Sequence, residues 1–299
     1  MYDVIIIGGG PAGLSAGIYA ARGGLNVAII ESKSIGGQAQ TAHEIQNYPG
    51  ISAIGGFDLC YAMMQQCISF GVEFIFDKIT SCDLQGKKIT LESGNELSAK
   101  FIIIATGASP RKLGAENESR FLGKGVSYCA TCDGAFFKGK TVAVIGGGNT
   151  AAEDALYLEK LAKKVYLVHR RDALRADKIL CDRLAKSSVE PIWDSVVQSL
   201  DGNDMLTQMT LKNVKNDTLT AVFVDGVFVA VGQLPESNLF DGVQKTSGGY
   251  IITDENMRTN IEGVFAVGDV REKSLRQVIT ACADGAVASN VIAMSATRK

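Results

Sequence analysis

The chain has 299 residues, 46% of them hydrophobic and 21% charged, with a formal net charge of −2 at pH 7. This make-up is typical of a soluble protein with room for two domains, and the absence of a dense Lys/Arg run argues against nucleic-acid and acidic-membrane partners. No apolar run approaches the roughly 18 to 20 residues of a membrane span, so we expect a cytoplasmic protein whose partners are small molecules or proteins.

The chain opens with an apolar strand at residues 2–7, followed by Gly-Gly-Gly-Pro-Ala-Gly at 8–13 and an Ala-rich helix. In this pattern Gly8 permits the tight turn, Gly10 lets the backbone approach a pyrophosphate, and Gly13 allows close helix packing. A second strand at 27–30 ends at Glu31, an acid placed to accept hydrogen bonds from a ribose. The pattern predicts a dinucleotide site, and a purely structural glycine turn is the weaker alternative.

Residues 34–50 form a loop rich in turn residues, which either lines the cofactor or connects elements. We expect a helix at 56–70, strands at 72–76, 88–91 and 101–104, and a boundary where glycine and proline follow at 105–110.

Cys129 and Cys132 lie in the stretch Cys-Ala-Thr-Cys-Asp-Gly, a spacing that lets the sulfurs cycle between dithiol and disulfide. Zinc would need two further ligands, and the only histidines, His43 and His169, are far apart in sequence, so we expect no metal site. Two packed core cysteines are a third alternative, disfavoured by turn-forming neighbours. The other five cysteines are expected in the core: Cys60, Cys67, Cys82, Cys181 and Cys282.

The opening pattern recurs, with a strand at 141–145 and Gly-Gly-Gly-Asn-Thr-Ala at 146–151, so the chain holds two dinucleotide folds. After the next strand, at 165–168, His169 stands where the first unit has Glu31. Arg170, Arg171 and Arg175 follow it, and such a cluster suits a 2′-phosphate, although a solvated basic patch is the alternative.

The last segment has a strand running into Gly268-Asp269 and a helix from about 277 to 293. Asp269 is either a ligand or a turn residue. Two nucleotide sites and a redox disulfide form an electron path, which requires a flavin between nicotinamide and sulfur.

Taken together, these motifs resemble the low-molecular-weight thioredoxin reductase family of flavoproteins from end to end. The motifs are GGGPAG at 8–13, GGQ at 36–38, ATG at 105–107, CATCDG at 129–134, GGGNTA at 146–151, HRRDALR at 169–175, GVFAVGDV at 263–270, and RQ at 276–277. The resemblance implies an α/β fold of two Rossmann-like domains. An NADPH domain at 112–237 is inserted into a discontinuous FAD domain at 1–111 and 238–299.

The resemblance also implies roles for individual residues. Cys132 would face the flavin, Cys129 would exchange with thioredoxin, and Asp133 would protonate the departing thiolate. FAD would be held by Gly8, Gly10, Pro11, Ala12, Gly13, Glu31, Gly36, Gly37, Gln38, Asn47, Asp269, Arg276 and Gln277. NADPH would be held by Gly148, Asn149, Thr150, Arg170, Arg171 and Arg175.

The family is homodimeric, and relatives fed by ferredoxin are expected to lack the arginine cluster. Ala151 departs from glycine at the third position of the second motif, where alanine also permits close packing. Two alternatives stay open at this point. The chain either reduces another dithiol protein, such as a glutaredoxin-like or peroxiredoxin partner, or is a non-enzymatic flavin redox sensor.

Overall fold

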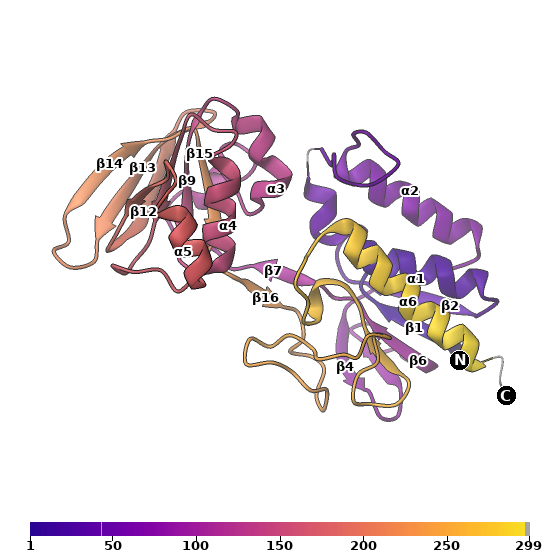
Figure 1. Ribbon diagram of the computed structural model, residues 1–299. Helices are drawn as coiled ribbons and strands as arrows, with labels where there is room; N and C mark the ends of the chain where they lie inside the picture. The colour runs from indigo at the N-terminus through magenta and orange to yellow at the C-terminus, as the bar shows by residue number, and fades with distance from the viewer. Residues whose placement is uncertain (43, 297–299) are drawn as a thin grey trace. The chain divides into compact units, whose positions relative to one another are not determined.

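The computed structural model describes residues 1–42 and 44–296, and the chain folds into two compact units (Figure 1). One unit comprises Met1–Ser109 and Leu234–Lys299, and the other comprises Pro110–Gln233. The sequence puts these boundaries slightly further along the chain, at residues 111–112 and 237–238. The short strands β7 (Ala108–Pro110) and β16 (Gln233–Pro235) pair where the chain passes between the units. His43 lies outside the described residues.

The first unit contains a seven-stranded sheet with the order β3-β2-β1-β6-β5-β4, and β17 also pairs with β6. The strands β1, β2, β3, β6 and β17 are parallel, whereas β4 and β5 are antiparallel additions. Their bounds are β1 (Tyr2–Ile7), β2 (Val27–Glu31), β3 (Glu73–Phe76), β4 (Ile79–Asp83), β5 (Lys88–Leu91), β6 (Glu96–Ile104) and β17 (Val264–Ala266). Because β17 pairs with β6, the N-terminal and C-terminal segments of the first unit contribute strands to one sheet.

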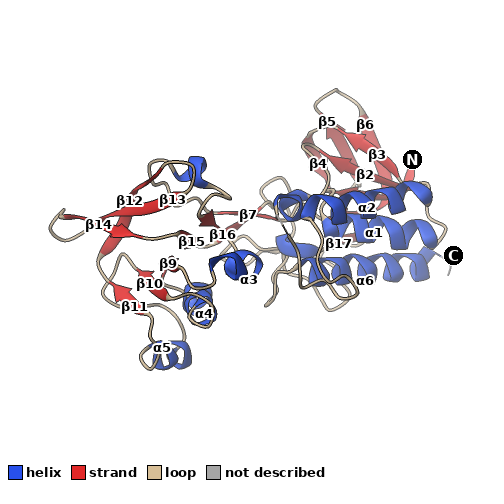
Figure 2. Cartoon of the chain, turned by 90° about the horizontal axis from the view of Figure 1, so that it is seen from above, coloured by secondary structure: helices blue, strands red, loops and turns tan. Residues whose placement is uncertain are grey.

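Three helices lie side by side along this sheet, with α1 (Pro11–Arg22) between α2 (Gly56–Ser69) and α6 (Val278–Ala296) (Figure 2). Val4 and Ile6 of β1 pack in the cluster that contains these helices, while Ile5 and Ile7 pack on the other face with residues of the C-terminal segment. Burial of both faces explains why β1 reads as a continuous apolar run rather than an alternating one.

Helix α6 corrects one expectation from the sequence. Its stretch Val278–Ser295 has a mean hydropathy of 1.4, so by length and composition a helix apolar enough to cross a membrane does exist. In the structure it packs closely against α1: the Ser289 hydroxyl donates to the Ala16 carbonyl at 2.8 Å, and a Cβ added to Gly285 would lie 2.3 Å from the Ala12 carbonyl oxygen. These contacts show that one face of α6 packs directly on α1 in the first unit.

The second unit has a five-stranded parallel sheet with the order β11-β10-β9-β15-β8. Its strands are β8 (Val126–Ser127), β9 (Thr141–Gly146), β10 (Lys164–Val168), β11 (Glu190–Ile192) and β15 (Gly226–Ala230), and its helices are α3 (Ala130–Asp133), α4 (Asn149–Leu158) and α5 (Lys178–Leu184). An antiparallel meander of β12 (Ser195–Gly202), β13 (Leu206–Asn213) and β14 (Leu219–Phe223) completes the unit (Figure 1).

The meander was not predicted from the sequence. Val142 and Val144 of β9 pack in a cluster with α4, while Ala143 and Ile145 pack in a second cluster with Leu200 and other meander residues. The parallel sheet is therefore covered by helices on one face and by the meander on the other.

The expected fold class is confirmed, because both units are Rossmann-like. In each, the strand that precedes the glycine motif lies between two parallel neighbours: β1 between β2 and β6, and β9 between β10 and β15. Strand order reverses at such a point, and α/β proteins bind ligands at the carboxyl ends of strands there. Both glycine motifs stand at that end.

Candidate functional site

The first glycine turn has the geometry that the sequence predicts. Gly8 has φ +111°, and a Cβ added to Gly13 would lie only 1.9 Å from the Gly8 carbonyl oxygen. Glycine at these positions therefore allows α1 to lie directly on the turn. Gly10 differs, because an added Cβ there would meet nothing within 4 Å. Gly10 also gives α1 no side-chain cap, so no capping side chain occupies the start of the helix, where an anion would bind.

Glu31 lies beside this turn at the end of β2. Its Oε2 accepts the Gly9 N–H at 2.9 Å, and its Oε1 accepts the Lys33 N–H at 2.8 Å. Each carboxylate oxygen has a second acceptor position, so the acid can hold the turn and still bind a ribose hydroxyl.

The loop after β2 folds back onto the same turn. The Gly36 N–H donates to the Gly9 carbonyl at 2.8 Å, and a Cβ added to Gly37 would lie 3.6 Å from Gly10 Cα. Gln38 is exposed in the 3₁₀ turn η1 (Gly37–Thr41). Thus the GGQ motif borders the open space at Gly10.

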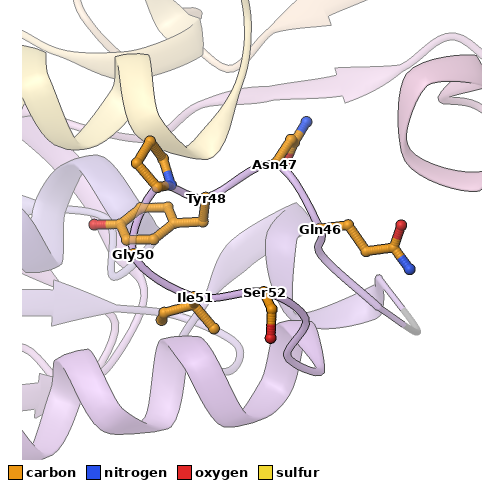
Figure 3. A pocket seen from close by; sticks show the side chains of 7 residues that line it. Gln46, Asn47, Tyr48, Gly50, Ile51 and Ser52 are labelled. Carbon is orange, nitrogen blue, oxygen red and sulfur yellow. The ribbon is translucent and has the colours of Figure 1, made fainter.

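Two further residues implied by the resemblance, Asn47 and Gln277, meet although they are far apart in the chain. The Asn47 Nδ2 donates to Gln277 Oε1 at 3.1 Å. Asn47 belongs to a shallow pocket lined by residues 46–52, where the loop curves and the Gln46 and Asn47 side chains point outward (Figure 3).

Asp269, in the 3₁₀ turn η4 (Gly268–Val270), and Arg276 both carry buried atoms that need partners. Among the described residues, Asp269 Oδ1 and Arg276 Nε have none. Burial raises the pKa of Asp269, and the nearby cations of Lys273 and Arg276 act against that shift. A ligand that offers hydroxyls and hydrogen-bond acceptors would satisfy both atoms. The Arg276 guanidinium also stacks 4.3 Å from the centre of the Tyr250 ring, a contact the sequence did not reveal.

Asp284 was also missed by the sequence reasoning. It is 7% exposed on α6, receives the Lys273 ammonium at 2.7 Å, and accepts the Gly268 N–H at 3.0 Å. It thereby fixes the turn that carries Asp269. A single acid inside an otherwise uncharged helix was the available signal, because buried acids are rare unless paired.

The second glycine turn repeats the first with different neighbours. A Cβ added to Gly148 would meet nothing within 4 Å, like one at Gly10, whereas a Cβ at Gly147 would overlap the His169 ring at 2.2 Å. His169 is 5% exposed, and its Nε2 has no partner among the described residues. Burial, followed by the charges of Arg175, Arg170 and Arg171, lowers the pKa of His169 and favours its neutral form.

The loop with the arginines is attached to this turn. The Arg175 N–H donates to the Gly147 carbonyl at 2.7 Å. Asn149 exchanges two hydrogen bonds with Asp177, both of 2.8 Å. The Asn149 side chain is thus used to anchor the loop, whereas Thr150 is exposed at the start of α4.

Arg170, Arg171 and Arg175 are all exposed, and within the described part of the chain none has a carboxylate at ion-pair distance. Three cations without acidic partners, beside an open glycine turn, have the charge to hold a doubly charged anion.

Cys129 and Cys132 form a disulfide at α3, with Cα atoms 5.3 Å apart, and both residues are partly exposed. The Asp133 N–H donates to the Cys129 carbonyl at 3.1 Å, closing the turn. Asp133 also accepts a hydrogen bond of 2.7 Å from the buried Ser127 hydroxyl. The sequence reasoning named Asp133 but not Ser127, which precedes the motif. No group of His, Cys, Asp and Glu residues suited to a metal occurs among the described residues.

The remaining five cysteines are less uniform than expected. Cys60, Cys67 and Cys282 are buried, but Cys82 and Cys181 are only partly so. Burial raises the thiol pKa to about 11 for Cys60 and Cys282, and to about 12 for Cys67 and Cys82.

Comparison with known proteins reveals close relatives. Residues 2–285 match the family model described as pyridine nucleotide-disulphide oxidoreductase. The chain is 46% identical to a thioredoxin reductase of Peptoclostridium acidaminophilum, covering 97% of this chain and 95% of the relative. It is 43% identical to a thioredoxin reductase of Treponema pallidum, and the match covers 98% of this chain and 96% of the relative. The crystal structure of thioredoxin reductase from Streptococcus pyogenes matches with a TM-score of 0.92 and 45% identity. The match covers 100% of this chain and 99% of that structure's chain.

The thiols should differ in reactivity according to this environment. After mild reduction of the native protein, iodoacetamide at pH 8 should rapidly alkylate two further residues, Cys129 and Cys132. The thiols with raised pKa should stay slow because little thiolate forms at that pH. Peptide mass spectrometry with and without reduction measures this. Cys181 is the internal control, because its labelling should not depend on reduction. Reduction-dependent labelling at any other pair would contradict the assignment.

Proposed function

The chain belongs to the pyridine nucleotide-disulphide oxidoreductase family, and we propose that it is a thioredoxin reductase that uses FAD and NADPH. The observation that carries this proposal is the partly exposed Cys129–Cys132 disulfide, which lies in the same compact unit as a phosphate-suited glycine turn. A second such turn, with an acid at its side, is the site for the flavin nucleotide.

FAD is assigned to the first unit. Glu31 would accept the ribose hydroxyls, the N–H groups at the start of α1 would bind the pyrophosphate, and Asp269 Oδ1 would accept a further hydroxyl. When bound, the flavin supplies a carrier that takes two electrons from a nicotinamide and passes them to a disulfide.

NADPH is assigned to the second unit. The N–H groups at the start of α4 would bind the pyrophosphate, and Arg170, Arg171 and Arg175 would bind the 2′-phosphate. His169 supports this choice, because a neutral imidazole packed on Gly147 offers no carboxylate to the ribose of NADH.

The reduced cysteines then perform the exchange. The Cys129 thiolate attacks one sulfur of the thioredoxin disulfide, and the departing thiolate takes a proton from Asp133. The Cys132 thiolate next attacks Cys129 in the mixed disulfide. This second attack restores the Cys129–Cys132 bond and releases the second thioredoxin sulfur, so two electrons have moved to thioredoxin.

The proposal also includes a homodimer, as the resemblance implies, and a cytoplasmic location, as expected from the sequence. Five cysteines outside the redox pair are free thiols, as is common in a reducing compartment. Two alternative functions are a reductase of another dithiol protein and a redox sensor. They differ in turnover, because a reductase would oxidise NADPH repeatedly, whereas a sensor would be reduced once by NADPH.

The flavin assignment is tested by Gly10→Ala, with Gly148→Ala as its matched control. Both added methyl groups enter open space, so both variants should fold. The Gly10 variant should bind FAD about 10- to 100-fold more weakly, because the methyl occupies the approach to the pyrophosphate. The Gly148 variant should keep its FAD. Flavin fluorescence during dialysis measures retention, and equal retention in both variants would refute the assignment.

The NADPH assignment predicts that Arg170→Ala and Arg171→Ala each reduce the preference for NADPH over NADH by roughly 10- to 150-fold, the worth of one charged hydrogen bond. KM for NADPH should rise while KM for NADH stays nearly constant, and added salt should shrink the difference. Lys212→Ala removes an equal charge from the meander and should leave the selectivity unchanged. If both arginine variants kept the full preference for NADPH over NADH, these residues would be an ordinary basic patch and the assignment would be wrong.

The central experiment is steady-state NADPH oxidation with thioredoxin as acceptor. Cys129→Ser and Cys132→Ser should each abolish turnover, because exchange needs both sulfurs, while NADPH still bleaches the flavin. Cys181→Ser, in the same unit, should remain active. A panel of small dithiol proteins separates the alternatives, and near-normal turnover in either redox-pair variant would disprove the proposal.

A further inference from the structure

Ser127 is the last residue of β8, two positions before the redox motif, and is 4% exposed. Its hydroxyl oxygen makes three contacts: it lies 2.7 Å from Asp133 Oδ2, 3.3 Å from the Cys129 carbonyl, and 3.0 Å from the Cys129 N–H, which donates to it. Ser127 thus touches both ends of the segment from Cys129 to Asp133.

A hydroxyl has one proton to donate, so the two acceptors compete. Asp133 Oδ2 lies closer to the hydroxyl than the Cys129 carbonyl does, and a hydrogen bond to Oδ2 becomes roughly twice as strong once Asp133 has lost its proton. The hydroxyl therefore donates to Asp133 Oδ2 and accepts from Cys129. Because Ser127 is buried, water does not compete for this bond.

We propose that Ser127 is a positioning residue for Asp133, holding Oδ2 so that Oδ1 carries the proton given to the departing thiolate. The inference rests on the proposed function. Two effects follow from the geometry: the Asp133 side chain is fixed in one orientation, and the carboxylate that forms when the proton leaves already has a donor in place.

The proton balance supports this arrangement. As the Cys129 thiolate bonds to one thioredoxin sulfur, the thioredoxin S–S bond breaks, and the departing thiolate takes the Oδ1 proton. The Cys132 thiol then returns a proton to Asp133 and attacks Cys129 as a thiolate. The second thioredoxin thiolate leaves and takes that proton in turn. Asp133 handles both protons through one oxygen, while Ser127 keeps the other.

The test is a double-mutant cycle of Ser127→Ala and Asp133→Asn. Ser127→Ala should lower kcat for thioredoxin reduction about 10-fold, the minimum expected for a lost hydrogen bond to a charged group, with KM for thioredoxin within about twofold of wild type. In the Asp133→Asn background the same change should have no further effect, because the serine acts through the carboxylate. A purely structural serine would instead lower kcat in both backgrounds by the same factor.

Ser195→Ala is the matched control. Ser195 is 7% exposed in the same unit, and its hydroxyl donates to the Trp193 carbonyl at 2.8 Å rather than to Asp133. The control should have wild-type kcat, and flavin reduction by NADPH should be normal in every variant, which excludes misfolding as the cause. Wild-type kcat in Ser127→Ala, or full additivity in the cycle, would overturn the inference. Turnover in Cys129→Ser would instead overturn the proposed function, so the two failures are distinguishable.

Discussion

The close approach of a helix to its preceding strand is the constraint on which both proposed nucleotide sites depend. At Gly13 even one methyl group would overlap the Gly8 carbonyl, and at Gly146, the last residue of β9, it would lie 2.7 Å from the Ala151 Cβ in α4. Because no side chain fits at these contacts, the start of each helix lies at the carboxyl end of its strand, where its free N–H groups can bind an anion. The open positions at Gly10 and Gly148 follow from the same geometry.

The two turns share a backbone geometry but differ in the side chain beside them, in line with the two cofactors proposed for them. In each, a residue at the carboxyl end of the second strand contacts the middle glycine of the motif. Glu31, the last residue of β2, accepts the Gly9 N–H, whereas the ring of His169, which follows β10, packs on Gly147. The first turn is supported by a hydrogen bond to the Glu31 carboxylate, and the second by the packing of the His169 ring. A carboxylate beside Arg170 and Arg171 would pair with them and compete with a phosphate, while a neutral imidazole supports the turn and leaves their charge free.

Local patterns in the sequence predicted the two glycine turns, the parallel core strands, α6 and the pairing of Cys129 with Cys132. Each is set by residues close together in the chain. The meander β12–β14 was missed, because its strands are recognisable mainly through their packing on the face of the sheet opposite α4. Asp284 and Ser127 were missed for a related reason. Their importance comes from partners, Lys273 and Asp133, that only the folded chain brings to them.

The distribution of satisfied polar groups separates the two kinds of site. Within the described residues, the buried side-chain atoms without partners are Asp269 Oδ1, Arg276 Nε and His169 Nε2, all at the proposed cofactor sites. A buried group without a partner costs about 1 to 3 kcal/mol, so a ligand that satisfies it is bound more tightly and stabilises the fold in return. The redox segment is different, because Ser127, Cys129 and Asp133 already satisfy one another. This segment passes electrons to a protein that then dissociates. Because its hydrogen bonds are internal, its geometry does not rely on contacts with that protein.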